Sequence, residues 1–126
     1  MKMIQMKIEL IIVPVSDVER AKAFYTEKIG FHADHDHVVS EDIRFVQLTP
    51  PGSACSIAIG KGLTEKKPGS LSAILMVVED IKAAREELLK RGVEISEIDV
   101  QPWADFAYFR DPDGNSWSLQ ELPKRA

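Results

Sequence analysis

Two stretches of the sequence share one pattern and decide the fold: VPVSDVERAKAFYTEKIGF at residues 13–31 and LMVVEDIKAAREELLKRGV at residues 75–93. Each stretch begins with an apolar segment of strand character, passes a residue with N-cap preference and continues as an apolar stripe at helical spacing. Each then reaches a glycine suited to a left-handed helix cap. Asp17 aligns with Asp80 and, after a one-residue adjustment, Gly30 aligns with Gly92. The chain therefore contains an internal repeat with a period of about 63 residues.

The segments around these helices complete two similar halves. We predict helices over residues 18–29, with a capping box from Ser16 to Glu19, and over residues 81–91. Alternation and β-branched residues predict strands, with breakers between them, over 7–15, 31–39, 43–49 and 56–59 in the first half and over 72–78, 93–100, 105–110 and 116–121 in the second. The turn DPDGN at 111–115 predicts a hairpin between the last two strands. Each half therefore reads βαβββ.

These patterns predict an α+β fold in one domain, residues 1–126, made of tandem modules at 7–60 and 71–122. Four strands and one helix cover only one face of a sheet, so the modules must join through their strands or pair across a dimer. We expect a curved, largely antiparallel mixed sheet whose other face surrounds a cleft.

Composition limits the class of partner. The 126 residues are 44% hydrophobic and 29% charged, which is typical of a soluble globular domain. The net charge is −4 and no window gathers five or more basic residues, so nucleic acid is not an expected partner. Lys2, Gln5, Lys7 and Glu9 interrupt the apolar N-terminus, which predicts neither a signal peptide nor a membrane span. The single cysteine, Cys55, forms no internal disulfide, and we expect a cytoplasmic protein.

The doubled plan, the stretch at 13–31 and the ending FRDPDGNSWSLQE at 109–121 resemble the vicinal oxygen chelate superfamily. This superfamily includes glyoxalase I, bleomycin-resistance proteins, extradiol dioxygenases and fosfomycin-resistance enzymes. The resemblance covers residues 7–122 and is specific for the fold but not for the reaction. It implies a homodimer and, in the enzymatic members, a divalent metal held in the cleft by His and Glu, with one ligand on each of four strands.

The family's four metal-ligand positions fall here on Leu10, Ala58, Ala73 and Ser118. Two alanines and a leucine have no donor atom, and a neutral serine hydroxyl is a poor ligand for zinc, nickel or iron. The resemblance therefore predicts no metal at the usual place, and we expect no cofactor. Whether the protein is an enzyme stays open.

The histidines of FHADHDH at 31–37 offer a displaced metal site. On a regular strand His35 and His37 share one face, and His32 lies on the other. With Asp34 or Asp36 nearby they could hold a metal, but two histidines supply only half a zinc site, and a solvated strand is the favoured interpretation.

The segment QPWADFAYFR at 101–110 concentrates aromatic residues of the kind that stack on flat ligands. Alternation places Phe106, Tyr108 and Arg110 on one face of its strand and Asp105, Ala107 and Phe109 on the other, and the sequence does not decide which face meets a ligand. Packing of these aromatic residues in the core of the protein is as strongly favoured as contact with a ligand. In the last strand, Ser116, Ser118 and Gln120 share a face, and the resemblance to the family implies that it is the cleft face. We expect the cleft to be lined by Leu10, Arg44, Ala58, Ala73, Trp103, Phe106, Tyr108, Ser118 and Gln120.

The sequence is compatible with two functions. The first is metal-independent binding of a small hydrophobic or aromatic molecule, as in bleomycin-resistance proteins, with specificity from Trp103, Tyr108 and Gln120. The second is a metal-dependent glyoxalase-like lyase or dioxygenase with displaced ligands among the histidines of 32–37.

Overall fold

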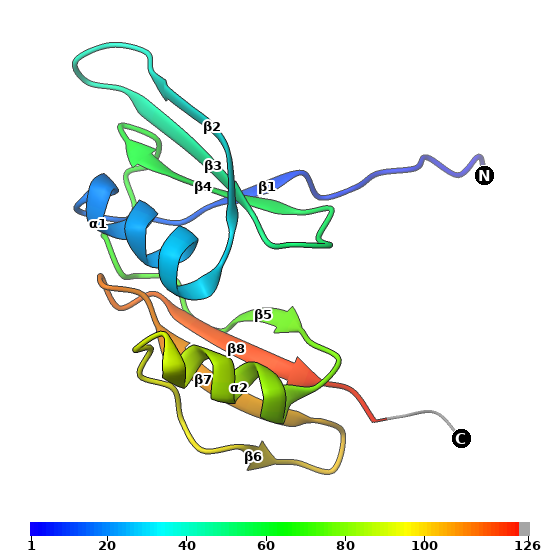
Figure 1. Cartoon of the computed structure of the whole chain (residues 1–126). Coiled ribbons are helices and arrows are strands. Elements are labelled where there is room, and N and C mark those ends of the chain that lie inside the picture. Colours follow the sequence, from blue (N-terminus) through cyan, green and yellow to red (C-terminus); the bar gives the residue numbers. More distant parts are fainter. Residues whose placement is uncertain (124–126) are drawn as a thin grey trace.

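The computed structural model of the chain describes residues 1–123 and shows two modules, each with a four-stranded sheet and a helical segment (Figure 1). The first module contains β1 (Leu10–Ile12), α1 (Val18–Ala23), η1 (Phe24–Ile29), β2 (His32–Val38), β3 (Arg44–Thr49) and β4 (Ser56–Lys61). The second contains β5 (Ile74–Val77), α2 (Ile81–Lys90), β6 (Asp99–Val100), β7 (Asp105–Arg110) and β8 (Ser116–Glu121). This order confirms the α+β class and the tandem βαβββ modules. The last three residues of the expected domain lie outside the described residues.

The strands form two mixed sheets with the same topology, ordered β1-β4-β3-β2 and β5-β8-β7-β6. In each sheet the first strand pairs in parallel with the last, and the remaining pairs are antiparallel. β1 and β5 are therefore edge strands, each with one side that pairs with no strand of residues 1–123.

Both helical segments begin at an aspartate. The carboxylates of Asp17 and Asp80 accept hydrogen bonds from the backbone N–H groups of residues 20 and 83, at 3.1 and 3.0 Å, as N-caps do. The predicted capping box is wrong, because the Ser16 hydroxyl donates to Asp113 and the Glu19 carboxylate pairs with an arginine of β3. The predicted left-handed cap at Gly30 is confirmed by its φ of 95°.

Several strands are shorter than the alternation predicts. β1 covers three residues of the predicted 7–15. β4 starts at Ser56, whose N–H donates to the Glu9 carbonyl at 2.9 Å, and no residue of β4 lies opposite residues 7–9 in the ladder. Of the predicted 93–100, only β6 forms a ladder, with one isolated bridge at Ile95. Local pattern marks residues that suit a strand, but ladder length depends on the partner strand.

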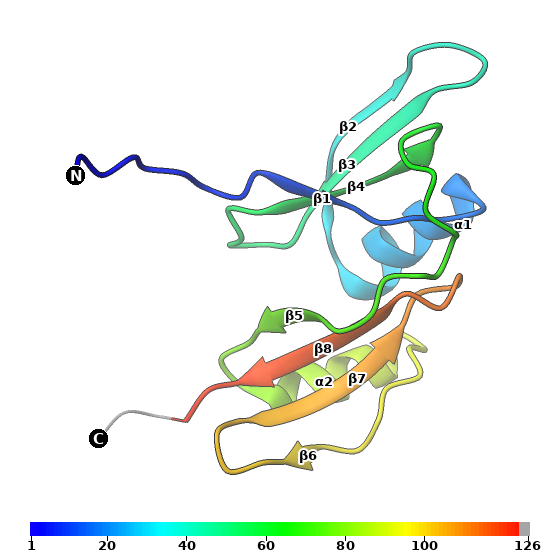
Figure 2. The same cartoon turned by 180° about the vertical axis from the view of Figure 1, so that it is seen from behind.

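The two modules share one aromatic core. The helical segments lie on the near side of the sheets in Figure 1 and behind them in Figure 2. Tyr25 and Phe31 of the first module pack on Trp117 of the second, with ring centroids 5.7 and 5.8 Å away, and Phe109 stacks on Trp117 at 6.1 Å. All four side chains are at least 95% buried. Burial of rings of this size joins the modules along their helix-bearing sides.

A buried polar network crosses the same boundary. The Tyr25 hydroxyl donates to Asp111 at 2.7 Å and accepts from Trp117 Nε1 at 2.9 Å. Asn115 donates from Nδ2 to the same carboxylate at 2.8 Å and to the Pro14 carbonyl at 2.9 Å. Burial, reinforced by the nearby Asp111 carboxylate, raises the pKa of Tyr25 far above its ordinary value. The turn at 111–115 forms the predicted hairpin and also fixes one module against the other.

Candidate functional site

Each sheet has one face covered by helix and one uncovered face, called here the open face; Figure 2 views the molecule from the side opposite the helices. Residues directly opposite each other in a ladder point to the same side. In the first sheet Ala58 lies opposite Ile12 and Gln47, and this set forms the open face. In the second sheet Ser118 lies opposite Leu75 and Tyr108, and Gln120 lies opposite Phe106.

The four family metal positions fall into two separate pairs. Leu10 and Ala58 lie on the open face of the first sheet, and Ala58 is fully buried. Ser118 lies on the open face of the second sheet. Ala73 precedes β5 with a φ of 57°, and its N–H donates to the Ser116 hydroxyl at 2.9 Å. None of these side chains supplies an imidazole or a carboxylate, so the donor set does not fit a divalent transition metal.

Displaced ligands do not form a cluster within the described part of the chain. Among residues 1–123 there is no group of three or more His, Cys, Asp or Glu side chains that could hold a metal ion. A bulge between Ala33 and His35 changes the register of β2, so that His32 lies opposite Thr49 and His35 opposite Gln47. The prediction that His32 points to the other face is therefore wrong. The rings of His35 and His37 stack with centroids 5.6 Å apart.

The structure decides which side of β7 faces outward. Ala107 and Phe109 are buried in the core, so Phe106, Tyr108 and Arg110 lie on the open face. The rings of Phe106 and Tyr108 are parallel to within 9°, with centroids 6.3 Å apart. The Tyr108 hydroxyl donates to Asp99 at 2.6 Å, and this hydrogen bond to a carboxylate raises the pKa of Tyr108. Two aligned rings thus stand side by side on a strand.

Polar groups adjoin these rings on the second sheet. A hollow of about 600 Å³ is lined by Ala73, Tyr108, Arg110, Ser116 and Ser118, among others. Hydroxyl groups that donate and accept, a guanidinium and an aromatic ring can together stack on a flat ligand and bind its oxygen atoms.

One expected cleft residue lies on the helix-bearing side of its sheet, and another lies in a loop. Arg44 has its guanidinium paired with Glu19 and, at 2.8 Å, with Asp36, on the side that carries the helix. These hydrogen bonds raise the pKa of Arg44 and satisfy its charge within the chain, so it does not reach the open face. Trp103 lies in the loop between β6 and β7 with 61% of its surface exposed.

The first sheet contributes polar residues that we did not predict. On its open face Gln47 Nε2 donates to the Ser56 hydroxyl at 3.2 Å, and this hydroxyl lies 2.7 Å from that of Thr49. The alternation of RFVQLT at 44–49 was the available signal, because Val46 and Leu48 occupy the buried side.

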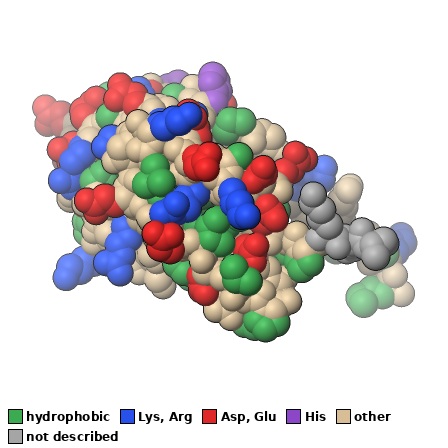
Figure 3. Space-filling model, turned by 60° about the horizontal axis from the view of Figure 1, so that its bottom comes forward, with side chains coloured by type: hydrophobic (Ala, Val, Ile, Leu, Met, Phe, Trp, Pro, Cys, Tyr) green, Lys and Arg blue, Asp and Glu red, His purple; other side chains and the backbone are tan. Residues whose placement is uncertain are grey.

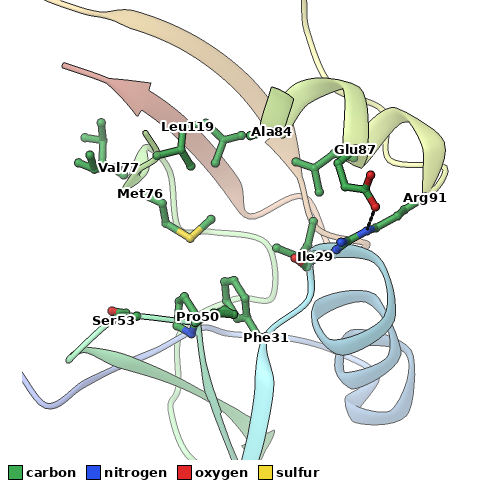
Figure 4. Close-up of a pocket in the computed structure, with 15 residues that line it drawn as sticks. Ile29, Phe31, Pro50, Ser53, Met76, Val77, Ala84, Glu87, Arg91 and Leu119 are labelled. Carbon is green, nitrogen blue, oxygen red and sulfur yellow. Dashed lines mark hydrogen bonds and ion pairs between the residues drawn. The ribbon is translucent and has the colours of Figure 1, made fainter. Parts of the chain in front are cut away.

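A second hollow, of about 530 Å³, lies between the modules (Figure 4). Phe31 and Pro50 line it from the first module, and Met76 and Leu119 line it from the second. At its edge Arg91 binds the Glu87 carboxylate at 3.1 Å.

On the face shown in Figure 3, acidic and basic side chains are interspersed. No helix among residues 1–123 has the length and apolar character needed to cross a membrane.

The paired βαβββ modules, with one face of each sheet left uncovered by helix, define a class of small α+β proteins. The model of the Glyoxalase/Bleomycin resistance protein/Dioxygenase superfamily matches residues 7–119. The chain belongs to this superfamily.

Individual relatives cover nearly the whole chain. YetH of Bacillus subtilis (strain 168) is 31% identical over 117 residues, which are 91% of this chain and 98% of that protein. TnmS3, an antibiotic binding protein from Streptomyces sp. CB03234, has 34% identity and a TM-score of 0.88, with 97% of this chain and 100% of that one covered. A glyoxalase/bleomycin resistance protein from the same organism has 36% identity and a TM-score of 0.80, covering 90% and 99%.

Proposed function

We propose that the protein binds a small hydrophobic or aromatic molecule on its open sheet faces without a metal ion, in the manner of a bleomycin-resistance protein. One observation carries the proposal. Where a metal-dependent member of the family needs four ligands, this chain has Leu10, Ala58, Ala73 and Ser118. The open face of the second sheet instead presents the parallel rings of Phe106 and Tyr108.

The chemistry of the alternative reactions needs what these positions lack. A lyase or dioxygenase of this superfamily uses its metal as a Lewis acid toward substrate oxygens. Alkyl side chains at positions 10, 58 and 73 supply neither a metal ligand nor a general base. Binding by stacking and apolar contact needs no metal ligand, only aromatic and alkyl side chains such as those on the open faces. The likeness to TnmS3 supports an antibiotic as the class of ligand.

We infer that the binding unit is a homodimer. The two open faces belong to separate sheets, and β1 and β5 each have a free edge. A second copy could cover these edges and bring the first sheet of one copy beside the second sheet of the other, which would turn two shallow surfaces into a cleft. We place the protein in the cytoplasm, where a lone thiol such as Cys55 stays reduced.

Elemental analysis and tryptophan fluorescence test the proposal together. Tag-free protein grown with nickel, zinc, iron and manganese should carry less than about a tenth of an ion per chain, because the donor set is absent. Planar aromatic antibiotics should quench Trp103, which is exposed, far more than Trp117, which is buried. Trp103→Phe removes the quenching and serves as the control, while calorimetry on the same variant reports binding.

The opposite result is equally clear. About one tightly held ion per chain would overturn metal-independent binding and direct attention to His35 and His37. Loss of that ion in His35→Ala, with retention in a surface variant such as Lys82→Ala, would establish the displaced site.

A further inference from the structure

The hollow on the second sheet contains a serine hydroxyl that the protein leaves without a partner. Ser118 has only 8% of its surface exposed, yet its hydroxyl forms no hydrogen bond with any group of residues 1–123. Every side-chain nitrogen or oxygen that is fully buried in this part of the chain has a partner, so the Ser118 oxygen must open into the hollow. A nearly buried polar group without a partner gains from a ligand that supplies one.

A second hydroxyl in the hollow has a proton to donate. Ser116 shares the open face with Ser118, and its oxygen accepts a hydrogen bond from the Ala73 N–H at 2.9 Å. This hydroxyl donates to no group of the described chain. A serine hydroxyl can donate one hydrogen bond and accept others, so both serines can donate to the same ligand oxygen.

Arg110 adds a positive charge beside these hydroxyls. It lies directly opposite Ser116 in the β7–β8 ladder and also lines the hollow. Its guanidinium forms neither an ion pair nor a hydrogen bond with residues 1–123, whereas the guanidinium of Arg44 is held by two carboxylates. A planar guanidinium with unused donors matches the geometry of a carboxylate.

Two acidic residues line the same hollow and bear on its charge. The Asp111 carboxylate is occupied, because it accepts hydrogen bonds from Tyr25 and from the Asn115 side chain within the core. Glu94 forms no ion pair with a group of residues 1–123 and places a negative charge in the hollow without neutralising Arg110 directly. Glu94 therefore weakens the attraction for an anion but leaves the guanidinium available.

We propose that the ligand of the second sheet is a planar aromatic acid, whose rings stack on Phe106 and Tyr108 and whose carboxylate binds Arg110 and the hydroxyls of Ser116 and Ser118. This inference rests on the proposed ligand-binding function and names the chemical class of the ligand. The ladder supports the arrangement, because Ser118 lies opposite Tyr108 and Ser116 lies opposite Arg110. Rings and donors are therefore adjacent on one side of the sheet.

The arrangement reverses the charge of the site found in metal-dependent relatives. There the position of Ser118 belongs to a glutamate, which implies that a metal ion lies between the protein and the ligand's oxygen atoms. Here a neutral hydroxyl stands at that position and a cation stands beside it, so the protein can donate directly to an anionic oxygen. Hydrogen bonds between charged partners are roughly twice as strong as neutral ones, so the acid is favoured over its neutral analogues.

Calorimetry with two probes of nearly equal shape tests the proposal. Naphthalene-2-carboxylate should bind the full chain at least about tenfold more tightly than naphthalene-2-carboxamide at pH 7, because only the first carries a charge. Arg110→Gln should reduce this ratio to about two or less, since the charge that discriminates is gone. Lys82→Gln, which removes a cation from the exposed side of α2, is the matched control and should keep the ratio. Glu94→Gln should strengthen binding of the carboxylate.

Ser118→Ala separates a binding role from a structural one. The Ser118 hydroxyl has no partner in the protein, so its removal should weaken binding of the carboxylate by about threefold or more without lowering the urea midpoint of the free protein. Ser56→Ala is the comparison, because the Ser56 hydroxyl bonds Gln47 and Thr49 and its loss should lower that midpoint. A Ser118→Ala protein that is destabilised but binds the carboxylate normally would overturn the role of this hydroxyl.

The neutral probe keeps this inference distinct from the proposed function on which it rests. Equal binding of both probes by the unaltered protein would refute the preference for an acid and leave aromatic binding intact. A ratio unchanged by Arg110→Gln would likewise refute the site. Binding of neither probe would refute the proposed function and this inference together.

Discussion

The Tyr25 hydroxyl joins the two modules, and its removal gives the sharpest test of how they are held together. Tyr25→Phe deletes one oxygen atom and leaves the aromatic core otherwise intact. Asp111 loses a donor at 2.7 Å but keeps three, from the backbone N–H groups of Asp113 and Asn115 and from the Asn115 side chain. Trp117 Nε1, in contrast, loses its acceptor inside the core.

These two losses set the expected magnitude. A hydrogen bond to a charged group contributes about 1.5–3 kcal/mol, and an orphaned buried donor costs about 1–3 kcal/mol. Phenylalanine has no hydroxyl that must lose its water on folding, and this offsets part of the two losses. We therefore expect a net decrease of about 3 kcal/mol in the free energy of unfolding. This is a large part of the 5–15 kcal/mol typical of a domain. Urea titration at several protein concentrations should show a lower midpoint with an unchanged slope.

Tyr108→Phe is the control, because it removes a hydroxyl that donates to a carboxylate at the surface. Its loss should be much smaller, and equal losses in the two variants would refute the role given to the buried network. Alkaline pH adds a second readout. The native pKa of Tyr25 lies above that of the unfolded chain, about 10, so its contribution is complete below pH 10 and is lost as pH rises further. Tyr25→Phe should lack this alkaline component.

Three further predictions concern other parts of the molecule. Hydrogen bonds from Arg44 and a lysine hold the pKa of the Asp36 carboxyl well below its usual range, so this carboxylate contributes stability above about pH 4 that is lost as pH falls. Arg44→Ala should therefore reduce the difference between the free energies of unfolding at about pH 7 and at about pH 3, measured by urea titration. Gly69→Ala should destabilise by at least about 2 kcal/mol in thermal unfolding, because φ is +82° and the new Cβ would lie 2.1 Å from the Asp113 carbonyl oxygen; an unchanged melting temperature would contradict this geometry. Tyr108→Ala should weaken binding of a planar aromatic ligand by about 1–1.5 kcal/mol in calorimetry, whereas Tyr108→Phe should retain the stacking contribution.

The sequence predicts the helices well because their signals are local. Asp17, Asp80 and Gly30 each act through the backbone within a few residues, and no distant contact is needed to interpret them. Strand length was overestimated for the opposite reason. Whether residues 7–9 join a ladder depends on where β4 begins, more than forty residues later in the chain.

The faces of the strands show the same limit. Both sides of β7 carry aromatic residues, so alternation alone could not separate Phe106 from Phe109. Only the packing of Phe109 into the shared core decides the face. The bulge in β2 brings His32 to the same side as His35, but the segment contains no glycine that would indicate a bulge. Asp111 sits in a segment whose composition predicts a solvated turn, and its burial against Tyr25 follows from how the modules meet.

The residues that replace the metal ligands also favour an apolar ligand on physical grounds. A glutamate at the fully buried position of Ala58 would need a cation or strong donors to offset its desolvation, and without a metal that cost would remain. Alkyl side chains at positions 10 and 58 avoid it. The neighbouring polar groups of Gln47, Thr49 and Ser56 bind one another, so they demand little from a ligand. A surface built in this way gains most from a partner that removes carbon from water, and specificity then depends on the shape of the rings and hydroxyls of the second sheet.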